Sequence, residues 1–331
     1  MIKLPNPIRA YFNGQVKDQL GYERMKIDFR ASPGEEALYP PDSLAWQTYK
    51  NPVALFIGGV SAVYMQLADP RVRSGVWEHS SFKDNAVTRI QRTGLAAMMT
   101  VYGQKSAAER MITHVNRMHE QVKGTMADGR EYNATDPELL NWVFSTANFA
   151  FFNAYDRFGP GAPKDKLDEG YRMASERVAG LYGVTQAGTT AEEVEQYLHS
   201  RLEELELHSI LDEFTEIVQN APLLPSYMRP VQSLLARAAA SNIPQAIRDQ
   251  AGLDDSYGLR RGEETVVKAL CRLSDKLYLE AHPAVMSCER LGLPADYLFR
   301  KSSNDNVEGG AAPGRNGPDT SSDQEIGAPH L

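Results

Sequence analysis

Residues 89–143 read RIQRTGLAAMMTVYGQKSAAERMITHVNRMHEQVKGTMADGREYNATDPELLNWV, and this stretch decides the fold. Apolar residues recur in it at helical spacing, in three runs separated by turn-forming residues. The stretch therefore predicts three consecutive helices. On these helices it places two arginines, a threonine, a histidine and a tryptophan, a combination that predicts a cofactor pocket.

The first helix is predicted over residues 86–102, and its two faces differ in kind. One face is an apolar packing stripe, and the other combines two arginines with small residues. Such a face leaves room for a flat anionic molecule, because the arginine fork donates two parallel hydrogen bonds to carboxylates or phosphates. The alternative is an arginine pair salt-bridged to a neighbouring helix, which spacing alone favours because buried arginines are usually paired. The second face consists of Arg89, Arg92, Thr93, Ala96, Ala97 and Thr100.

The next helix is predicted to open at Ser106, with Glu109 completing a capping box. His114 and His119 lie five residues apart, about 140° around a helix, so one face cannot direct both to the same metal. Each histidine alone is more often a core or boundary residue than a ligand. The predicted apolar stripe is Met111, Val115, Met118 and Val122.

The third helix follows a predicted turn at residues 128–132. Thr135 and Glu138 form a second capping box, with Pro137 in the first helical turn. The aromatic-rich stripe of this helix is more typical of plain core than of a ligand wall. It consists of Leu140, Val143, Phe144, Ala147, Phe151 and Tyr155.

Three motifs in this stretch resemble one oxygenase family. The motifs are Arg89-x-x-Arg92-Thr93, MHEQVKG and DGREYNATDPELLNWV, and they are similar to the core of the latex-clearing-protein (rubber oxygenase) and MpaB-type group. Segments on either side extend the resemblance, so that it covers about residues 35–255. These segments are PPDSLAW (40–46), the run 58–66, GVWEHSSF (75–82), LPSYMRP (224–230) and IPQAIRDQAGL (243–253).

The resemblance implies an all-α fold, a single globular multi-helix domain with one haem b held between central helices. It points to His119 rather than His114 as the iron ligand, and it places Arg89 and Thr93 beside the cofactor. The position of Arg92 is a lysine on the distal side in rubber oxygenases, so arginine departs from that subgroup. We assign Arg92 and Thr93 to catalysis, as polar groups that steady dioxygen.

The chemistry of haem agrees with this assignment. Haem is flat, carries two propionates and needs a neutral imidazole on one axial side. We therefore assign Arg89 to a propionate, and we expect the second ring nitrogen of His119 to donate to a carbonyl or carboxylate. His79 is a further cofactor-binding candidate that would act through a neighbouring residue. Asp136 and Trp142 belong to the motif, and we expect structural roles for both.

Two positions depart from the family pattern. Relatives commonly carry a histidine where this chain has Asp69, and often another where it has Phe144. If either histidine contributes to the relatives' chemistry, this chain binds haem and catalyses a different reaction, or none.

The resemblance implies an oxygen-dependent oxidation of an apolar or isoprenoid-like small molecule, as in oxidative cleavage of a carbon–carbon double bond. We expect the substrate pocket to be apolar and lined by Phe144, Phe151 and Phe152. One alternative is a haem peroxidase or peroxygenase. The other is a non-catalytic haem-binding or partner protein.

Composition limits the remaining possibilities. The net charge of -8 and the lack of basic arms argue against nucleic acid as a partner. Nothing indicates that the two cysteines, Cys271 and Cys288, pair, and the N-terminus lacks the apolar core of a signal peptide, so we expect a cytoplasmic protein. The most apolar run, residues 53–68, is shorter than the roughly twenty residues that span a bilayer and is predicted to be a buried central helix.

The rest of the chain is predicted to be helical, with strand-like alternation nearly absent. One domain is expected over residues 1–300, followed by a disordered tail at 301–331 that is rich in Gly, Ser, Asn, Asp and Pro. Nucleotide-binding glycine loops and the E-x-x-H pairs of di-iron bundles do not occur. The further predicted helices are 164–181, 190–205, 208–220, 229–241 and 263–291.

Overall fold

The computed structural model describes residues 1–20, 27–79 and 86–300, and the predicted disordered tail at 301–331 lies outside them. Helices make up nearly all of the regular structure in these residues, which confirms the all-α prediction. The one sheet among them is a two-stranded hairpin. Residues 1–299 form one compact unit.

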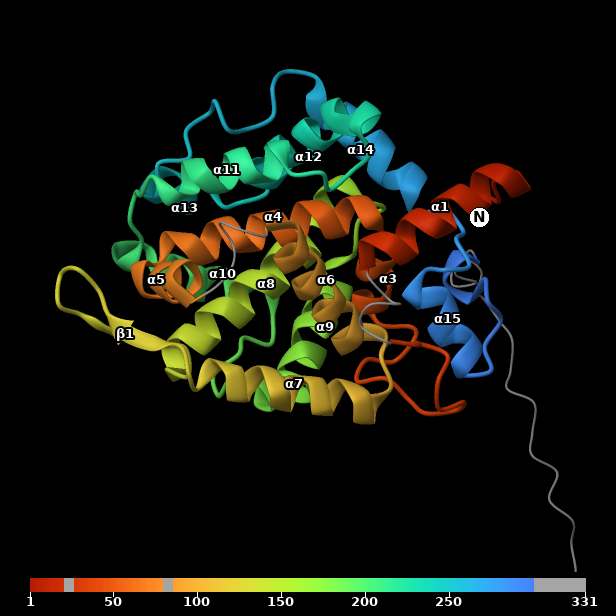
Figure 1. Cartoon of the computed structure of the whole chain (residues 1–331), viewed down its shortest axis with the longest axis horizontal. Coiled ribbons are helices and arrows are strands. Elements are labelled where there is room, and N and C mark those ends of the chain that lie inside the picture. The colour runs from red at the N-terminus through yellow and green to blue at the C-terminus, as the bar shows by residue number, and fades with distance from the viewer. Residues whose placement is uncertain (21–26, 80–85, 301–331) are drawn as a thin grey trace, which may run out of the picture. The chain divides into compact units, whose positions relative to one another are not determined.

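Helices α4 (Pro52–Ala68) and α8 (Pro137–Phe158) pack along one another at the centre of this unit (Figure 1). Gly58 permits the contact, because a Cβ atom there would lie 2.5 Å from Cδ1 of Phe151. Asn51 caps α4 by accepting from the amides of its first turn, and Pro52 occupies a position that needs no donor. The prediction of a buried central helix at 53–68 is confirmed.

Other helices surround this pair. None of the described helices is by itself long and apolar enough to cross a membrane. Helices α3 and α4 together have the length and composition of a membrane span, but a bend of 99° separates them. The surrounding helices are α1 (Asn6–Leu20), α3 (Leu44–Lys50), α5 (Pro70–His79), α9 (Lys164–Arg177), α10 (Ala191–Ser200), α11 (Ile210–Asn220), α12 (Arg229–Ser241), α13 (Gln245–Ala251), α14 (Glu263–Ser274) and α15 (Pro283–Arg290). Short 3-10 turns are η1 (Ala179–Tyr182), η2 (Leu202–Glu204), η3 (Ser226–Met228) and η4 (Tyr297–Phe299).

Helix α6 (Ala86–Tyr102) has the predicted bounds, and α7 (Lys105–His119) returns beside it. The predicted capping box at Ser106 is wrong, because Ser106 lies inside the first turn of α7. Its amide donates to Oε1 of Glu35 at 2.8 Å, so a carboxylate far along the chain caps the helix instead. Arg290 of α15 holds the same region, donating to the carbonyls of Phe29, Glu35 and Tyr102 at 2.9 Å each.

The predicted apolar stripe of α7 is also wrong in part. Ala108 and Ile112 are buried, whereas Met118 points outward with 48% of its surface exposed. Ile112 and His119 are seven residues apart, or two helical turns, so they lie on the same inward face. This places His119, and not its exposed neighbour His114, toward the interior.

A hairpin joins α7 to α8. Its strands, β1 (Lys123–Thr125) and β2 (Glu131–Asn133), were not predicted. The turn between them overlaps the turn predicted at 128–132, but Glu131 and Tyr132 of that range belong to β2. The predicted Thr135–Glu138 capping box is wrong, because Asp136 occupies the N-cap and accepts from the amide of Glu138. Asp136 thus has the structural role expected of it.

Two further corrections concern α8 and the C-terminal part. The predicted stripe of α8 is shifted, since Val143 is exposed while Leu139, Trp142 and Phe149 are buried. The single helix predicted at 263–291 is broken into α14 and α15. Pro283 begins α15, and the buried imidazole of His282 caps it by accepting from the amide of Ala284.

Candidate functional site

His119 is the last residue of α7 and is half-buried. Its Nδ1 atom is buried and has no hydrogen-bond partner among the described residues. Burial lowers the pKa of this imidazole below its usual value, and the charge of nearby Arg89 lowers it further. The ring is therefore neutral at pH 7, which is the form that binds a metal. The hydrogen bond expected from its second ring nitrogen to a carbonyl or carboxylate is not found in the described part of the chain.

Arg89 and Arg92 lie near the start of α6, and both are exposed. Partial burial lowers the pKa of Arg89, and the like charge of Arg92 lowers it further. Neither arginine forms an ion pair with a described residue. The alternative of an arginine pair salt-bridged to a neighbouring helix thus finds no carboxylate in the described residues. An arginine fork can donate two parallel hydrogen bonds to a carboxylate or phosphate.

His79 ends α5 and contacts the hairpin that follows His119. The hydroxyl of Tyr132 lies 2.9 Å from Nε2 of His79 and donates to Oε2 of Glu78 at 2.8 Å. Tyr132 is buried over Gly124, where a Cβ atom would lie 2.5 Å from its hydroxyl. These contacts hold the hairpin, and with it the end of α7, against α5. Apart from its place in the family motif, Tyr132 carries no local sequence signature that predicts this role.

Residues 46–275 match the protein family described as "ER-bound oxygenase mpaB/B'/Rubber oxygenase, catalytic domain". The chain belongs to this family. An uncharacterized protein of Mycobacterium bovis and one of Mycobacterium tuberculosis are each 25% identical to it over 222 residues, which cover 65% of this chain and 86% of each relative. No solved structure matches the chain. Membership gives it a general oxygenase role, as an oxidoreductase acting on a small molecule with dioxygen.

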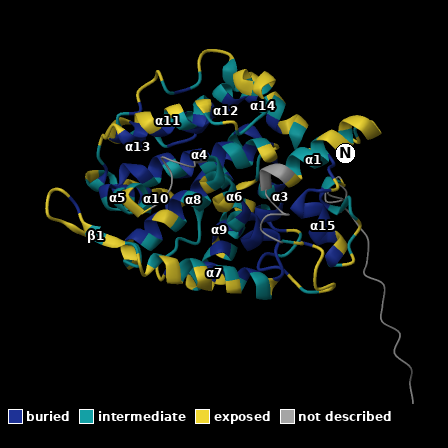
Figure 2. Cartoon of the chain, in the orientation of Figure 1, coloured by how far each residue is buried: buried dark blue, intermediate teal, exposed yellow. Residues whose placement is uncertain are grey.

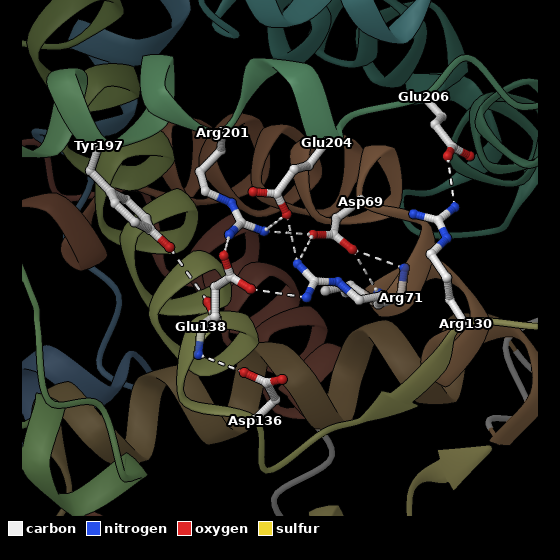
Figure 3. Close-up of polar contacts among 10 residues, drawn as sticks. Asp69, Arg71, Arg130, Asp136, Glu138, Tyr197, Arg201, Glu204 and Glu206 are labelled. Carbon is white, nitrogen blue, oxygen red and sulfur yellow. Dashed lines mark hydrogen bonds and ion pairs between the residues drawn. The ribbon is translucent and has the colours of Figure 1, made fainter. Parts of the chain in front are cut away.

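In this mpaB/rubber oxygenase domain, Asp69 lies at the buried end of an ion-pair cluster (Figure 3). Its fully buried carboxylate pairs with Arg201 at 3.1 Å and with Arg71 at 3.4 Å, and it accepts from the amide of Arg71 at the start of α5. Glu138 and Glu204 pair with the same two arginines and complete the cluster. The carboxylate of Asp69 thus has a structural role, since it joins the start of α5 to Arg201.

Sequence reasoning missed Arg201, which lies 132 residues from Asp69 and carries no local signature. Its Nε atom is buried without a partner among the described residues. A cavity of about 510 Å³ opens beside the cluster, and polar side chains, including Asn141, Thr185 and Tyr197, line it. The cavity is therefore not the apolar pocket that was expected.

Two of the three phenylalanines predicted to line a substrate pocket, Phe151 and Phe152, pack against other helices. Phe151 packs on Gly58 of α4 and on the ring of Tyr49. Phe152 is buried against the ring of Tyr171, on another side of α8. Phe144 lies seven residues before Phe151 and therefore on the same side of α8, so a pocket wall that includes these residues stays a prediction.

The residues of this oxygenase domain suit haem. The described part of the chain contains no group of three His, Cys, Asp or Glu side chains that could hold a metal ion. Haem needs only one protein ligand on its proximal side, because the macrocycle supplies four nitrogens. The neutral imidazole and the nearby arginine pair, which has no acidic partner in the part of the chain that the structure describes, match the ligand and the propionates of that cofactor.

Proposed function

We propose that this chain is a haem b-dependent oxygenase that oxidises an apolar, isoprenoid-like small molecule with dioxygen. One observation carries the proposal: the neutral imidazole of His119, with its unpartnered nitrogen, lies beside an arginine pair that has no acidic partner among the described residues. Oxidative cleavage of a carbon–carbon double bond is the first reaction to test.

His119 is the proposed iron ligand. A buried polar atom without a partner costs about 1–3 kcal/mol, which a ligand contact to the ring would offset. Because the pKa of the imidazole is lowered, protons compete with a metal only at pH values below about 6.5. The ring is therefore available to iron at neutral pH without first losing a proton.

Arg89 is the proposed partner of a propionate, since its positive charge is close to His119 and lacks an acid among the described residues. When bound, haem supplies the activation of dioxygen. Arg92 and Thr93, on the same helix, are the proposed donors toward dioxygen. His79 is proposed to act indirectly, because Nε2 of its ring is engaged with Tyr132 and thereby holds the hairpin after α7.

The test of the cofactor is an absorption spectrum of the purified protein, produced with haem supply and recorded before and after dithionite. We expect a stoichiometric Soret band in the wild type and its loss in His119→Ala. The matched control is His114→Ala, five residues earlier on the same helix and exposed, which should keep full haem content. A His119→Ala variant with full haem content would overturn the ligand assignment.

The test of the reaction follows with the loaded protein. Oxygen uptake and cleaved products from an isoprenoid, in the absence of peroxide, are the expected results. Turnover only with peroxide would identify the peroxidase alternative instead. A protein that loads haem without either activity would support the non-catalytic alternative, which the Asp69 and Phe144 departures favour.

A further inference from the structure

Exposed apolar side chains gather on α1, η3 and α14. On α1, Ile8 and Tyr11 are 47% and 46% exposed; in η3, Tyr227 is 67% exposed. On α14, Val266 and Leu273 are 50% and 58% exposed. These five residues make up what we call the α1–α14 surface, and Figure 2 shows exposed residues on both α1 and α14.

Contacts along the chain connect the parts of this surface. The hydroxyls of Tyr11 and Tyr227 lie 3.2 Å apart, which joins α1 to η3. Ile2 pairs with the segment that follows α14, its amide donating to the carbonyl of Lys276 at 2.6 Å. Val266 and Leu273 are seven residues apart and therefore share one face of α14, while Val267 and Cys271 on the opposite face are buried.

The charges around the surface are unbalanced. Acidic side chains there are engaged in ion pairs: Glu264 with Arg157 and Lys268, Asp275 with Lys50, and Glu280 with Arg9.

Three exposed basic residues of the same region, Arg229, Arg272 and Lys276, form no ion pair with a described residue. The region is thus locally basic on a chain whose net charge is -8. A partner that complements it is anionic and accepts apolar side chains.

We propose that the α1–α14 surface docks on an anionic lipid membrane. Exposed apolar and tyrosine side chains next to basic residues are the combination by which a helix lies in the interface of a bilayer, with the apolar side chains at the acyl boundary and the basic groups among the headgroups. Tyrosines suit this depth because one end of the ring system is apolar and the other is wet. A second copy of the chain fits poorly, since apposed surfaces would bring like charges together.

This inference concerns where the protein acts and does not depend on haem. An oxygenase docked in this way would meet its apolar substrates at the membrane, because apolar molecules concentrate in the lipid phase.

The test is co-sedimentation of the full chain with vesicles of phosphatidylcholine alone and of phosphatidylcholine mixed with phosphatidylserine, at low and at high salt. We expect binding only to the mixed vesicles, weakened by salt. Arg229→Gln and Lys276→Gln should each weaken it about fivefold. The double variant Val266→Glu and Leu273→Glu should abolish it.

The matched control is Leu207→Glu, because Leu207 is 71% exposed yet lies outside the surface. This variant should bind as the wild type does, and thermal melts should show that all variants fold. Equal binding to both kinds of vesicle, no binding to either, or an equal loss in Leu207→Glu would overturn the proposal. Self-association that the double variant abolishes, without vesicle binding, would overturn it in favour of a protein partner.

Discussion

Replacing Arg201 with methionine should strongly destabilise the fold. Methionine keeps much of the length and volume of the side chain and removes its charge. Asp69 is fully buried, and its remaining partner would be Arg71, at 3.4 Å. Removing one member of a buried pair costs about 3–5 kcal/mol, because the other charge stays desolvated. The remaining ion pair with Arg71 places the expected loss near the lower value, about 3 kcal/mol.

A second substitution isolates the charge. In the double variant Arg201→Met and Asp69→Asn, the amide oxygen can still accept from the amide of Arg71 at the start of α5, and no buried charge remains. We expect this variant to recover most of the lost stability, since replacing both members of a buried pair is often nearly neutral.

Urea denaturation followed by far-ultraviolet circular dichroism measures both effects. The control is Arg130→Met, which removes exposed ion pairs with Asp128 and Glu206 and should cost much less stability than Arg201→Met. If Arg201→Met costs no more than this control, or if the double variant is less stable than the single one, the reasoning about the cluster is refuted.

Further predictions concern pH, packing and the cofactor. Burial lowers the pKa of His282 to about 4 from 6.5, so the folded state binds fewer protons than the unfolded state and its free energy of unfolding should fall by about 3 kcal/mol between pH 6.5 and pH 4. Urea titrations across that range should show a smaller loss in His282→Asn than in the wild type. Equal losses would contradict the assignment. Gly58→Ala should cost about 1–3 kcal/mol by its clash with Phe151, whereas Gly94→Ala, with nothing within 4 Å, should gain up to about 1 kcal/mol in a thermal melt. Arg89→Met should weaken haem binding about ten- to a hundredfold in a transfer assay with apomyoglobin, and unchanged affinity would remove its proposed role.

The sequence predicted helices well where periodicity was the whole signal. The bounds of α6 and α12 agree with the predicted ranges because apolar positions and local propensity point to the same elements. Helix ends were less predictable. Ser106 and Thr135 were expected to cap their helices, but the carboxylates of Glu35 and Asp136 do so instead. A local capping motif considers only its own residues and cannot predict that another carboxylate will occupy the helix end.

The candidate site was predicted in part from helical spacing, and the orientation of its side chains came from the structure. The spacing of His114 and His119 excluded a shared metal but could not choose between them, whereas the structure turns His119 inward and leaves His114 exposed. Arg201 could not be found from the sequence, because an ion pair between residues 132 positions apart leaves no periodic trace. In the sequence, Asp69 stood out only as a departure from the family pattern. Its ion pairs with Arg71 and Arg201 explain why a carboxylate occupies this position.

The carboxylate of Glu35 at the start of α7 also bears on where the domain can be cut. The family match begins at residue 46 and ends at 275, yet the helix that carries His119 starts on Glu35, and Arg290 ties that region to the end of α6. A fragment trimmed to the matched residues would lack Glu35 and Arg290, which would leave the first turn of α7 without its cap and the carbonyl of Tyr102 without its donor. The matched region is thus smaller than the folding unit, and the flanks on either side of it serve as the framework that keeps His119 in place.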